Sequence, residues 1–156
     1  MLDRNRVRLR AMVTTDAETV LKIYGEGIQT GHATFEAEVP DWHKWDSGHL
    51  TQCRWVAEEG GTVLGWGALT QVSPRKVYSG VAEVSIYVSV AAQNQGIGSI
   101  LIERLRISSG KSDFWTLHAK LFPENKINIH VHEKHGYRKS GTRIQLALYV
   151  LWFHSR

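Results

Sequence analysis

The sequence has few of the residues that mark secreted, metal-binding or membrane proteins. It contains one cysteine, Cys53, so it can form neither an intrachain disulfide nor a cysteine-based zinc site, which favours a reducing compartment. Its longest apolar run, Leu146 to Phe153, is far shorter than the roughly 20 residues that span a bilayer, and no signal-peptide pattern opens the chain. We therefore expect a cytoplasmic protein that does not associate with a membrane.

Positive charge is in excess but is not concentrated. The formal net charge is +4, yet no run of lysine or arginine is longer than two residues, so we expect no nucleic-acid partner. The excess fits a small anionic ligand instead. Only three prolines are present, and neither a repeat nor a Pro/Gly/Ser linker divides the chain, which predicts a single domain over residues 1–156.

Hydrophobic periodicity predicts alternating strands and helices. Strands are expected at residues 7–13, 55–57, 63–69, 82–90, 115–121, 137–142 and 144–153, with a glycine turn at 58–61 and the last strand buried on both faces. Helices are expected from a Thr15–Glu18 capping box to Gly25 or Gly27, after Pro40, from Ile97, and over 126–135. The order β-α-(α)-β-β-β-α-β-α-β-β predicts an α/β (α+β) fold, a mixed sheet flanked by helices.

The most informative segment is the glycine-rich turn Gln93-Asn94-Gln95-Gly96-Ile97-Gly98 between a strand and a helix. Such a turn directs backbone N–H groups and the positive end of the helix dipole at a phosphate or pyrophosphate. It lacks the Gly-Lys-Ser/Thr of a P-loop and the third glycine of the dinucleotide fingerprint. Two glycines alone are weak evidence, because a helix start that needs backbone room would look the same.

The residues around the glycines match a longer pattern. Gln93-x-x-Gly96-x-Gly98 resembles the acyl-CoA pyrophosphate loop of the GNAT superfamily of N-acetyltransferases, (Gln/Arg)-x-x-Gly-x-(Gly/Ala). Further segments across residues 7–140 resemble its phosphinothricin N-acetyltransferase branch, which includes arsinothricin-acetylating enzymes; they are Ile23–Ile28, Ala33–Glu36, Glu83–Val88, Pro123–Asn125 and His132–Tyr137. The resemblance implies a mostly antiparallel mixed sheet, acetyl-CoA as co-substrate and a homodimer.

The resemblance also implies a set of site residues. Acetyl-CoA would be bound by Tyr87, Val88, Gln93, Asn94, Gln95, Gly96, Ile97, Gly98, Ser99 and Asn125, with backbone N–H groups of residues 87–89 polarising the thioester carbonyl. Asn125 has a second interpretation as the N-cap of the following helix, and we do not expect one side chain to do both.

Acetyl transfer to an amine needs a base for the ammonium proton and an acid for the departing thiolate. Glu83 is the candidate base, against the alternative of a solvated carboxylate at a strand edge. By resemblance His132 stands where many acetyltransferases place a tyrosine acid, and a half-buried structural histidine is an equal alternative. The resemblance implies an acceptor such as phosphinothricin or arsinothricin, a small anionic amino-acid analogue.

Residues in the predicted loop before the Glu83 strand and after the first helix are candidates for binding the acceptor. Arg75 and Lys76 could bind a phosphinate or arsinate group, or they could form a solvated surface pair. By resemblance Thr34, Phe35 and Tyr78 would complete the pocket. Trp42 and Trp45 could wall a cleft.

Other features point away from metal or thiol chemistry. His130, His132 and His135 do not have the spacing of a metal-binding helix, so no metal is expected. Cys53 is interpreted as a small core residue in a strand. The alternatives that remain are an acetyltransferase for another amine, such as methionine sulfoximine, and a non-catalytic CoA-binding sensor or nucleic-acid adaptor.

Overall fold

The structure, a computed structural model, describes residues 3–30, 37–122, 124–143 and 148–154. Its strands are β1 (Val7–Ala11), β2 (Trp55–Glu59), β3 (Thr62–Gln71), β4 (Val81–Val88), β5 (Thr116–Leu121), β6 (Arg138–Arg143) and β7 (Leu148–His154). Its α-helices are α1 (Ala17–Thr30), α2 (Trp42–Gly48), α3 (Ile97–Lys111) and α4 (Lys126–Lys134), with short 3₁₀ turns η1 (Arg4–Arg6), η2 (Thr14–Asp16), η3 (Lys76–Tyr78) and η4 (Val90–Ala92). This order of strands and α-helices confirms the sequence prediction.

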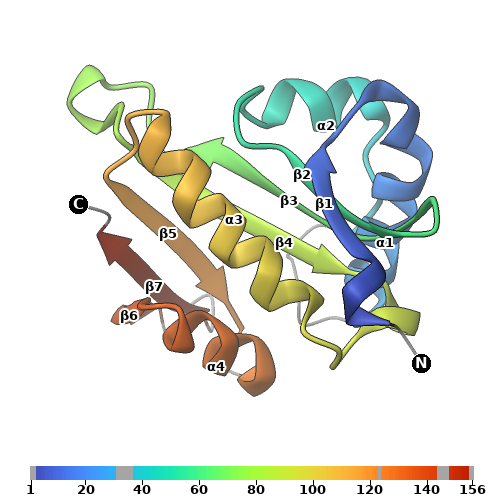
Figure 1. Cartoon of the computed structure of the whole chain (residues 1–156). Coiled ribbons are helices and arrows are strands. Elements are labelled where there is room, and N and C mark those ends of the chain that lie inside the picture. Colours follow the sequence, from blue (N-terminus) through green and yellow to red (C-terminus); the bar gives the residue numbers. More distant parts are fainter. Residues whose placement is uncertain (1–2, 31–36, 123, 144–147, 155–156) are drawn as a thin grey trace.

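One seven-stranded sheet runs through the molecule in the order β1-β2-β3-β4-β5-β7-β6 (Figure 1). Every neighbouring pair is antiparallel except β4 and β5, which are parallel. The mixed, mostly antiparallel sheet that was expected is therefore confirmed. The last strand is internal, paired with both β5 and β6; the burial of its side chains lies outside what the structure describes.

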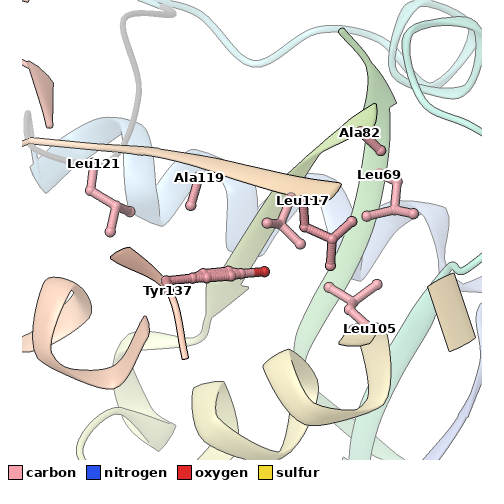
Figure 2. Close-up of a cluster of buried hydrophobic side chains, with 8 residues drawn as sticks. Leu69, Ala82, Leu105, Leu117, Ala119, Leu121 and Tyr137 are labelled. Atoms are coloured by element: carbon pink, nitrogen blue, oxygen red, sulfur yellow. The ribbon is translucent and has the colours of Figure 1, made fainter. Parts of the chain in front are cut away.

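Helices pack on both faces of this sheet. Helices α1 and α2 bury Val20, Ile23 and Trp45 against Val56 and Trp66 on one face. Helix α3 packs on the opposite face, where Leu105 meets a cluster that continues to Tyr137, just after α4 (Figure 2); the other buried members of that cluster are Leu69, Ala82, Val84, Leu117, Ala119 and Leu121. Since α3 and α4 contact each other, both lie on one side of β4 and β5.

Three local predictions are wrong in detail. The predicted Thr15–Glu18 capping box is the first. A 3₁₀ turn at residues 14–16 precedes the helix instead, and the Asp16 carboxylate accepts from the Val13 N–H at 2.8 Å. Helix α1 passes through Gly25 and Gly27 to Thr30, since its apolar face stays packed on the sheet and packing outweighs glycine's low helix propensity.

Cys53 is the third correction. It lies before β2 in a left-handed conformation (φ 61°), half-buried, with its thiol 3.7 Å from the Ser112 hydroxyl. The turn that joins β2 and β3 is as predicted, with Gly60 and Gly61 both at positive φ.

Candidate active site

The site begins where two parallel strands part. Strands β4 and β5 are paired only over residues 81–83 and 116–118, whereas β4 continues to Val88 beside β3. In an antiparallel pair, N–H groups point alternately to one edge and the other. The Ser89 N–H donates to the Leu64 carbonyl on β3 (2.8 Å), so the Tyr87 N–H points the same way and the Val88 N–H points to the edge that β5 has left. This narrows the carbonyl-polarising group expected within residues 87–89 to Val88.

A cleft of about 260 Å³ lies beside the end of β4. All but one of the residues predicted to bind the cofactor line it: Tyr87, Val88, Gln93, Asn94, Gly96, Ile97, Gly98, Ser99 and Asn125. The exception is Gln95, which lines a separate hollow with Val7 and Arg104 and whose amide donates to the Ala91 carbonyl at 3.4 Å. We call the cleft of about 260 Å³ beside the end of β4 the cofactor cleft.

The glycine-rich turn places the N-terminus of α3 in the wall of the cofactor cleft. Gly96 caps the helix in the left-handed region (φ 85°), and Asn94 is also left-handed (φ 61°). A side chain at Gly96 would be strained there. A Cβ at Gly98 would meet only Val88, at 3.8 Å, so this glycine leaves the cleft open for a ligand. The first N–H groups of a helix lack partners within the helix and suit an anion.

His135 contacts Ser99, in the first turn of α3. The Ser99 hydroxyl lies 2.5 Å from His135 Nε2, and His135 Nδ1 lies 3.3 Å from a Glu103 oxygen. Glu103 is also paired with Arg106, and hydrogen bonds from Arg106 are the main reason that the pKa of the Glu103 carboxyl is below its usual value. These contacts, from Arg106 through Glu103 and His135, hold the Ser99 side chain in the wall of the cofactor cleft. Within the described ranges, no group of three or more metal-ligating side chains is present.

Asn125 caps a helix and also stands in the wall of the cofactor cleft. Its side-chain oxygen accepts from the Asn128 N–H at 3.3 Å and so caps α4, while the residue also lines the cofactor cleft. The cap uses only the oxygen of the amide. The NH₂ group can still donate to a bound molecule.

A second cavity, of about 380 Å³, adjoins the cofactor cleft. The two hollows share Ile86, Tyr87 and Asn128 in their walls, so they meet at the end of β4. We call the second hollow the acceptor cavity. The remaining residues that line it are Tyr24, Pro40, Lys44, Trp45, Gly48, His49, Thr70, Glu83, Val84, Ser85, Lys120, Leu121, Phe122 and His132.

Both predicted catalytic residues line the acceptor cavity. The Glu83 side chain is 25% exposed, and its Oε1 lies 3.7 Å from the ammonium of Lys120. Along the strand Glu83 is five residues from Val88, about 16 Å between Cα atoms. A proton that leaves an amine near Val88 must therefore reach Glu83 through water.

His132 is neutral at physiological pH. Its ring is 3% exposed and Nδ1–H donates to the Asn128 carbonyl at 2.8 Å. Burial lowers the pKa of His132 to about 4. A neutral ring whose Nδ1 carries the proton offers only a lone pair at Nε2, so it can accept a hydrogen bond but has no proton to give a thiolate. The geometry favours an accepting role over the acid role.

Aromatic rings from α1, α2 and β4 line part of the acceptor cavity. Tyr24, Trp66 and Tyr87 stack with centroids 4.9–6.0 Å apart, and Trp45 meets Trp66 edge-on at 5.2 Å. His49 stacks on Trp45 at 4.0 Å, and burial lowers the pKa of His49. Trp45 thus lines the cavity as predicted. The prediction is wrong for Trp42, which stacks on Trp45 and does not line the cavity.

Three of the five residues predicted to bind the acceptor do not line the acceptor cavity. Arg75, Lys76 and Tyr78 are exposed in the segment between β3 and β4 and line none of the described hollows, because β3 carries them past the end of the cavity. Thr34 and Phe35 lie outside the described residues. The cations that do line the cavity, Lys44 and Lys120, were missed.

A sequence signal for Lys120 did exist. Leu117, Ala119 and Leu121 alternate on β5, which sets Thr116, His118 and Lys120 on the other face of that strand. Periodicity thus assigns Lys120 to that face, but it does not tell what lies opposite the lysine.

The helices within the described ranges include none with the length and hydrophobicity of a membrane-spanning segment.

Comparisons with known proteins agree with this geometry. The sequence model described as "Acetyltransferase (GNAT) family" matches residues 19–137. The Bacillus subtilis (strain 168) protein named "Putative phosphinothricin acetyltransferase YwnH" is 36% identical over 140 residues, covering 85% of each chain. Phosphinothricin N-acetyltransferase of Streptomyces viridochromogenes is 29% identical over 144 residues, covering 90% of this chain and 79% of that protein.

Solved structures share the fold. A phosphinothricin acetyltransferase from Sinorhizobium meliloti, solved in complex with acetyl-CoA, superposes with a TM-score of 0.79 at 24% identity, covering 94% of this chain and 86% of that one. An acetyltransferase from Kribbella flavida reaches a TM-score of 0.88 at 20% identity, covering 98% of this chain and 100% of that one. At these identities the likeness concerns the fold alone.

Proposed function

This chain belongs to the acetyltransferase (GNAT) family, and on that premise we propose that it transfers the acetyl group of acetyl-CoA to the α-amino group of a small anionic amino-acid analogue. Phosphinothricin and arsinothricin are the acceptors we propose, in a resistance role. The observation that carries the proposal is the meeting of the two hollows at Ile86, Tyr87 and Asn128. One hollow offers a helix N-terminus to a pyrophosphate, and the other offers a carboxylate to an amine.

The residues of the cofactor cleft fit acetyl-CoA. The open space at Gly98 and the N-terminus of the long helix α3 suit its pyrophosphate. The amide NH₂ of Asn125 suits a carbonyl of the pantetheine arm, and the Val88 N–H suits the thioester oxygen. These groups bind and orient the donor so that its carbonyl faces the acceptor cavity.

Glu83 is proposed as the base. It accepts the ammonium proton through water, and the free amine then attacks the carbonyl carbon while the Val88 N–H stabilises the oxygen that gains negative charge. His132 accepts a hydrogen bond at Nε2 and so orients a donor in the cavity, such as the acceptor ammonium or an ordered water. The nitrogen of the tetrahedral adduct loses its second proton as the amide forms, and the thiolate takes a proton from that nitrogen through water or from solvent.

The proposal extends to the setting of the enzyme. We propose a homodimer in the cytoplasm, supported by the almost continuously apolar last strand and by the single cysteine, which suits a reducing compartment.

The test is acceptor-dependent thiol release from acetyl-CoA by the purified chain. Phosphinothricin, arsinothricin, methionine sulfoximine and a simple alkylamine would be compared, with product mass confirming N-acetylation. We expect the first two to react with the highest kcat/KM. Thermal stabilisation by acetyl-CoA without release on any acceptor would support a non-catalytic CoA-binding protein and refute the enzyme proposal.

A further inference from the structure

The acceptor cavity has an excess of positive charge among its described lining residues. Among the described residues that line it, Lys44 and Lys120 are cationic and Glu83 alone is anionic. His49 and His132 are held neutral by burial, as described above. Two positive charges against one leave a net charge of +1. A ligand that carries one net negative charge would balance the cavity.

Lys120 is placed to meet the far end of an acceptor. Strands β4 and β5 are parallel and Glu83 pairs with His118, so Lys120 stands two residues farther along, level with Ser85. The side chain of Lys120 reaches back to Glu83, at the end of the cavity away from Val88. An acceptor whose amine and α-carboxylate lie toward Val88 therefore has its side-chain terminus toward Lys120.

The ion pair between Lys120 and Glu83 is weak, so Lys120 can bind another anion in place of Glu83. The Lys120 side chain is 47% exposed, the separation from Glu83 is 3.7 Å, and exposed pairs of this kind contribute little to stability. A phosphinate, arsonate or carboxylate could therefore bind the same ammonium, with a shorter, charge-assisted hydrogen bond. Without the ammonium, Glu83 would repel such a group.

We propose that Lys120 is a specificity-determining residue of this enzyme, which binds the side-chain acidic group of the acceptor while Lys44 adds a second positive charge. The acceptor class is then α-amino acids with an acidic side chain and one net negative charge, in preference to neutral amino acids and simple amines. This inference rests on the proposed acetyltransferase function and assigns its acceptor selectivity.

The experiment compares two acceptors that differ at the side-chain terminus. Phosphinothricin carries an anionic phosphinate there, whereas the sulfoximine group of methionine sulfoximine is neutral. Values of kcat and KM would be measured for the wild-type chain, Lys120→Met, Lys120→Arg and Lys44→Met. Lys111→Met is the matched control, because Lys111 is exposed at the end of α3 and lines none of the described hollows.

We expect Lys120→Met to raise the KM for phosphinothricin by about 10- to 100-fold, the loss of one charge-assisted hydrogen bond. The KM for methionine sulfoximine should change by less than about 3-fold, Lys120→Arg should restore most of the loss, and Lys44→Met should show a smaller effect in the same direction. Lys111→Met should leave both acceptors unchanged.

The outcomes that overturn the inference are distinct from failure of the enzyme proposal. Equal KM changes for both acceptors, or a shift only in the pH profile of kcat, would show that Lys120 acts solely as the partner of Glu83. A wild-type chain that acetylates neutral amines better than phosphinothricin would also refute it, with the acetyltransferase function intact. If the wild-type chain acetylates neither acceptor and calorimetry shows no phosphinothricin binding to the CoA-loaded protein, both proposals fail.

Discussion

At the scale of single residues, the site separates a partly exposed carboxylate from an imidazole that burial keeps neutral. Glu83 is partly exposed beside Lys120, whereas His132 is enclosed and tied to the Asn128 carbonyl. The carboxylate is therefore in contact with solvent water, whereas the imidazole offers a single enclosed lone pair at Nε2. The two residues singled out from the sequence thus have different chemistry available to them.

Glu83→Gln should lower turnover by about two to four orders of magnitude, because the amide keeps the size of the side chain and loses its basicity. Affinity for acetyl-CoA should stay unchanged, since Glu83 does not line the cofactor cleft. The loss should shrink as pH rises and more of the amine is already deprotonated. Steady-state kinetics over pH 6–9 would check this. Near-normal turnover at pH 7 would exclude the base role, and a large loss that is flat with pH would indicate that Glu83 orients the ammonium.

Burial of His132 should make the fold sensitive to acid. Its pKa is about 4 in the folded chain and about 6.5 when unfolded, so between these values the unfolded state binds more protons. The stabilising contribution is full above pH 6.5 and lost as pH falls to 4, on the order of 3 kcal/mol in total. Denaturant unfolding at pH 7.5, 6 and 5 should show this slope in the wild-type chain and not in His132→Gln. His130→Gln, at an exposed position of the same helix, is the control; equal slopes in all three would contradict the assignment.

At the scale of elements, the junction between β4 and α3 forms much of the wall of the cofactor cleft. The β4 strand ends at Val88, the η4 turn follows, and Gly96 in the left-handed region starts α3 beside that strand end. The N-terminus of α3 is thereby fixed next to an N–H group that β5 leaves without a partner strand. Both groups needed for a thioester with a pyrophosphate tail come from one continuous segment of chain.

Gly98→Val should abolish tight acetyl-CoA binding while the chain still folds. A Cβ there meets only Val88 at 3.8 Å, so the branched side chain enters the cofactor cleft instead of the core. Gly110→Val is a matched control on the same helix, because a Cβ at Gly110 meets nothing within 4 Å. Calorimetry should show at least about a 10-fold weaker affinity for Gly98→Val only, a loss of 1.4 kcal/mol or more. Equal affinities, with folding verified by circular dichroism, would remove the loop from the cofactor site.

At the scale of the whole molecule, the two ends of the sheet differ in which helices pack on them. Helices α1 and α2 cover the end that holds β2, β3 and β4, and α3 crosses the opposite face toward α4 (Figure 1). Strands β7 and β6 form the other end, and the sequence of β7 is almost entirely apolar. A second copy of the chain would supply cover for such a strand.

We therefore expect light scattering at micromolar concentration to give a mass near twice 17.7 kDa. The mass should stay the same in high salt, because apolar burial is not screened by ions. A mass of one chain across 1–100 µM would contradict the homodimer, and the thiol-release assay tests acetyl transfer separately.

The sequence by itself determined the order of the elements and the cofactor loop. Local periodicity, Gly60 and Gly61 at a tight turn, and the spacing of Gly96 and Gly98 are properties of neighbouring residues, so they could be read without knowing the fold. For the same reason nearly every residue predicted to line the cofactor cleft does so. Those residues lie on the single strand, turn and helix that the pattern covers.

Only the tertiary structure decided the acceptor cavity. Lys44 and Lys120 come from α2 and β5, far apart in the chain, and they line one cavity because β5 parts from β4 after Glu83. Arg75 is close to Glu83 in sequence yet lines none of the described hollows, because β3 and the loop after it extend beyond the cavity. The neutral state of His132 likewise depends on burial, which arises from packing between distant elements and leaves no local trace in the sequence.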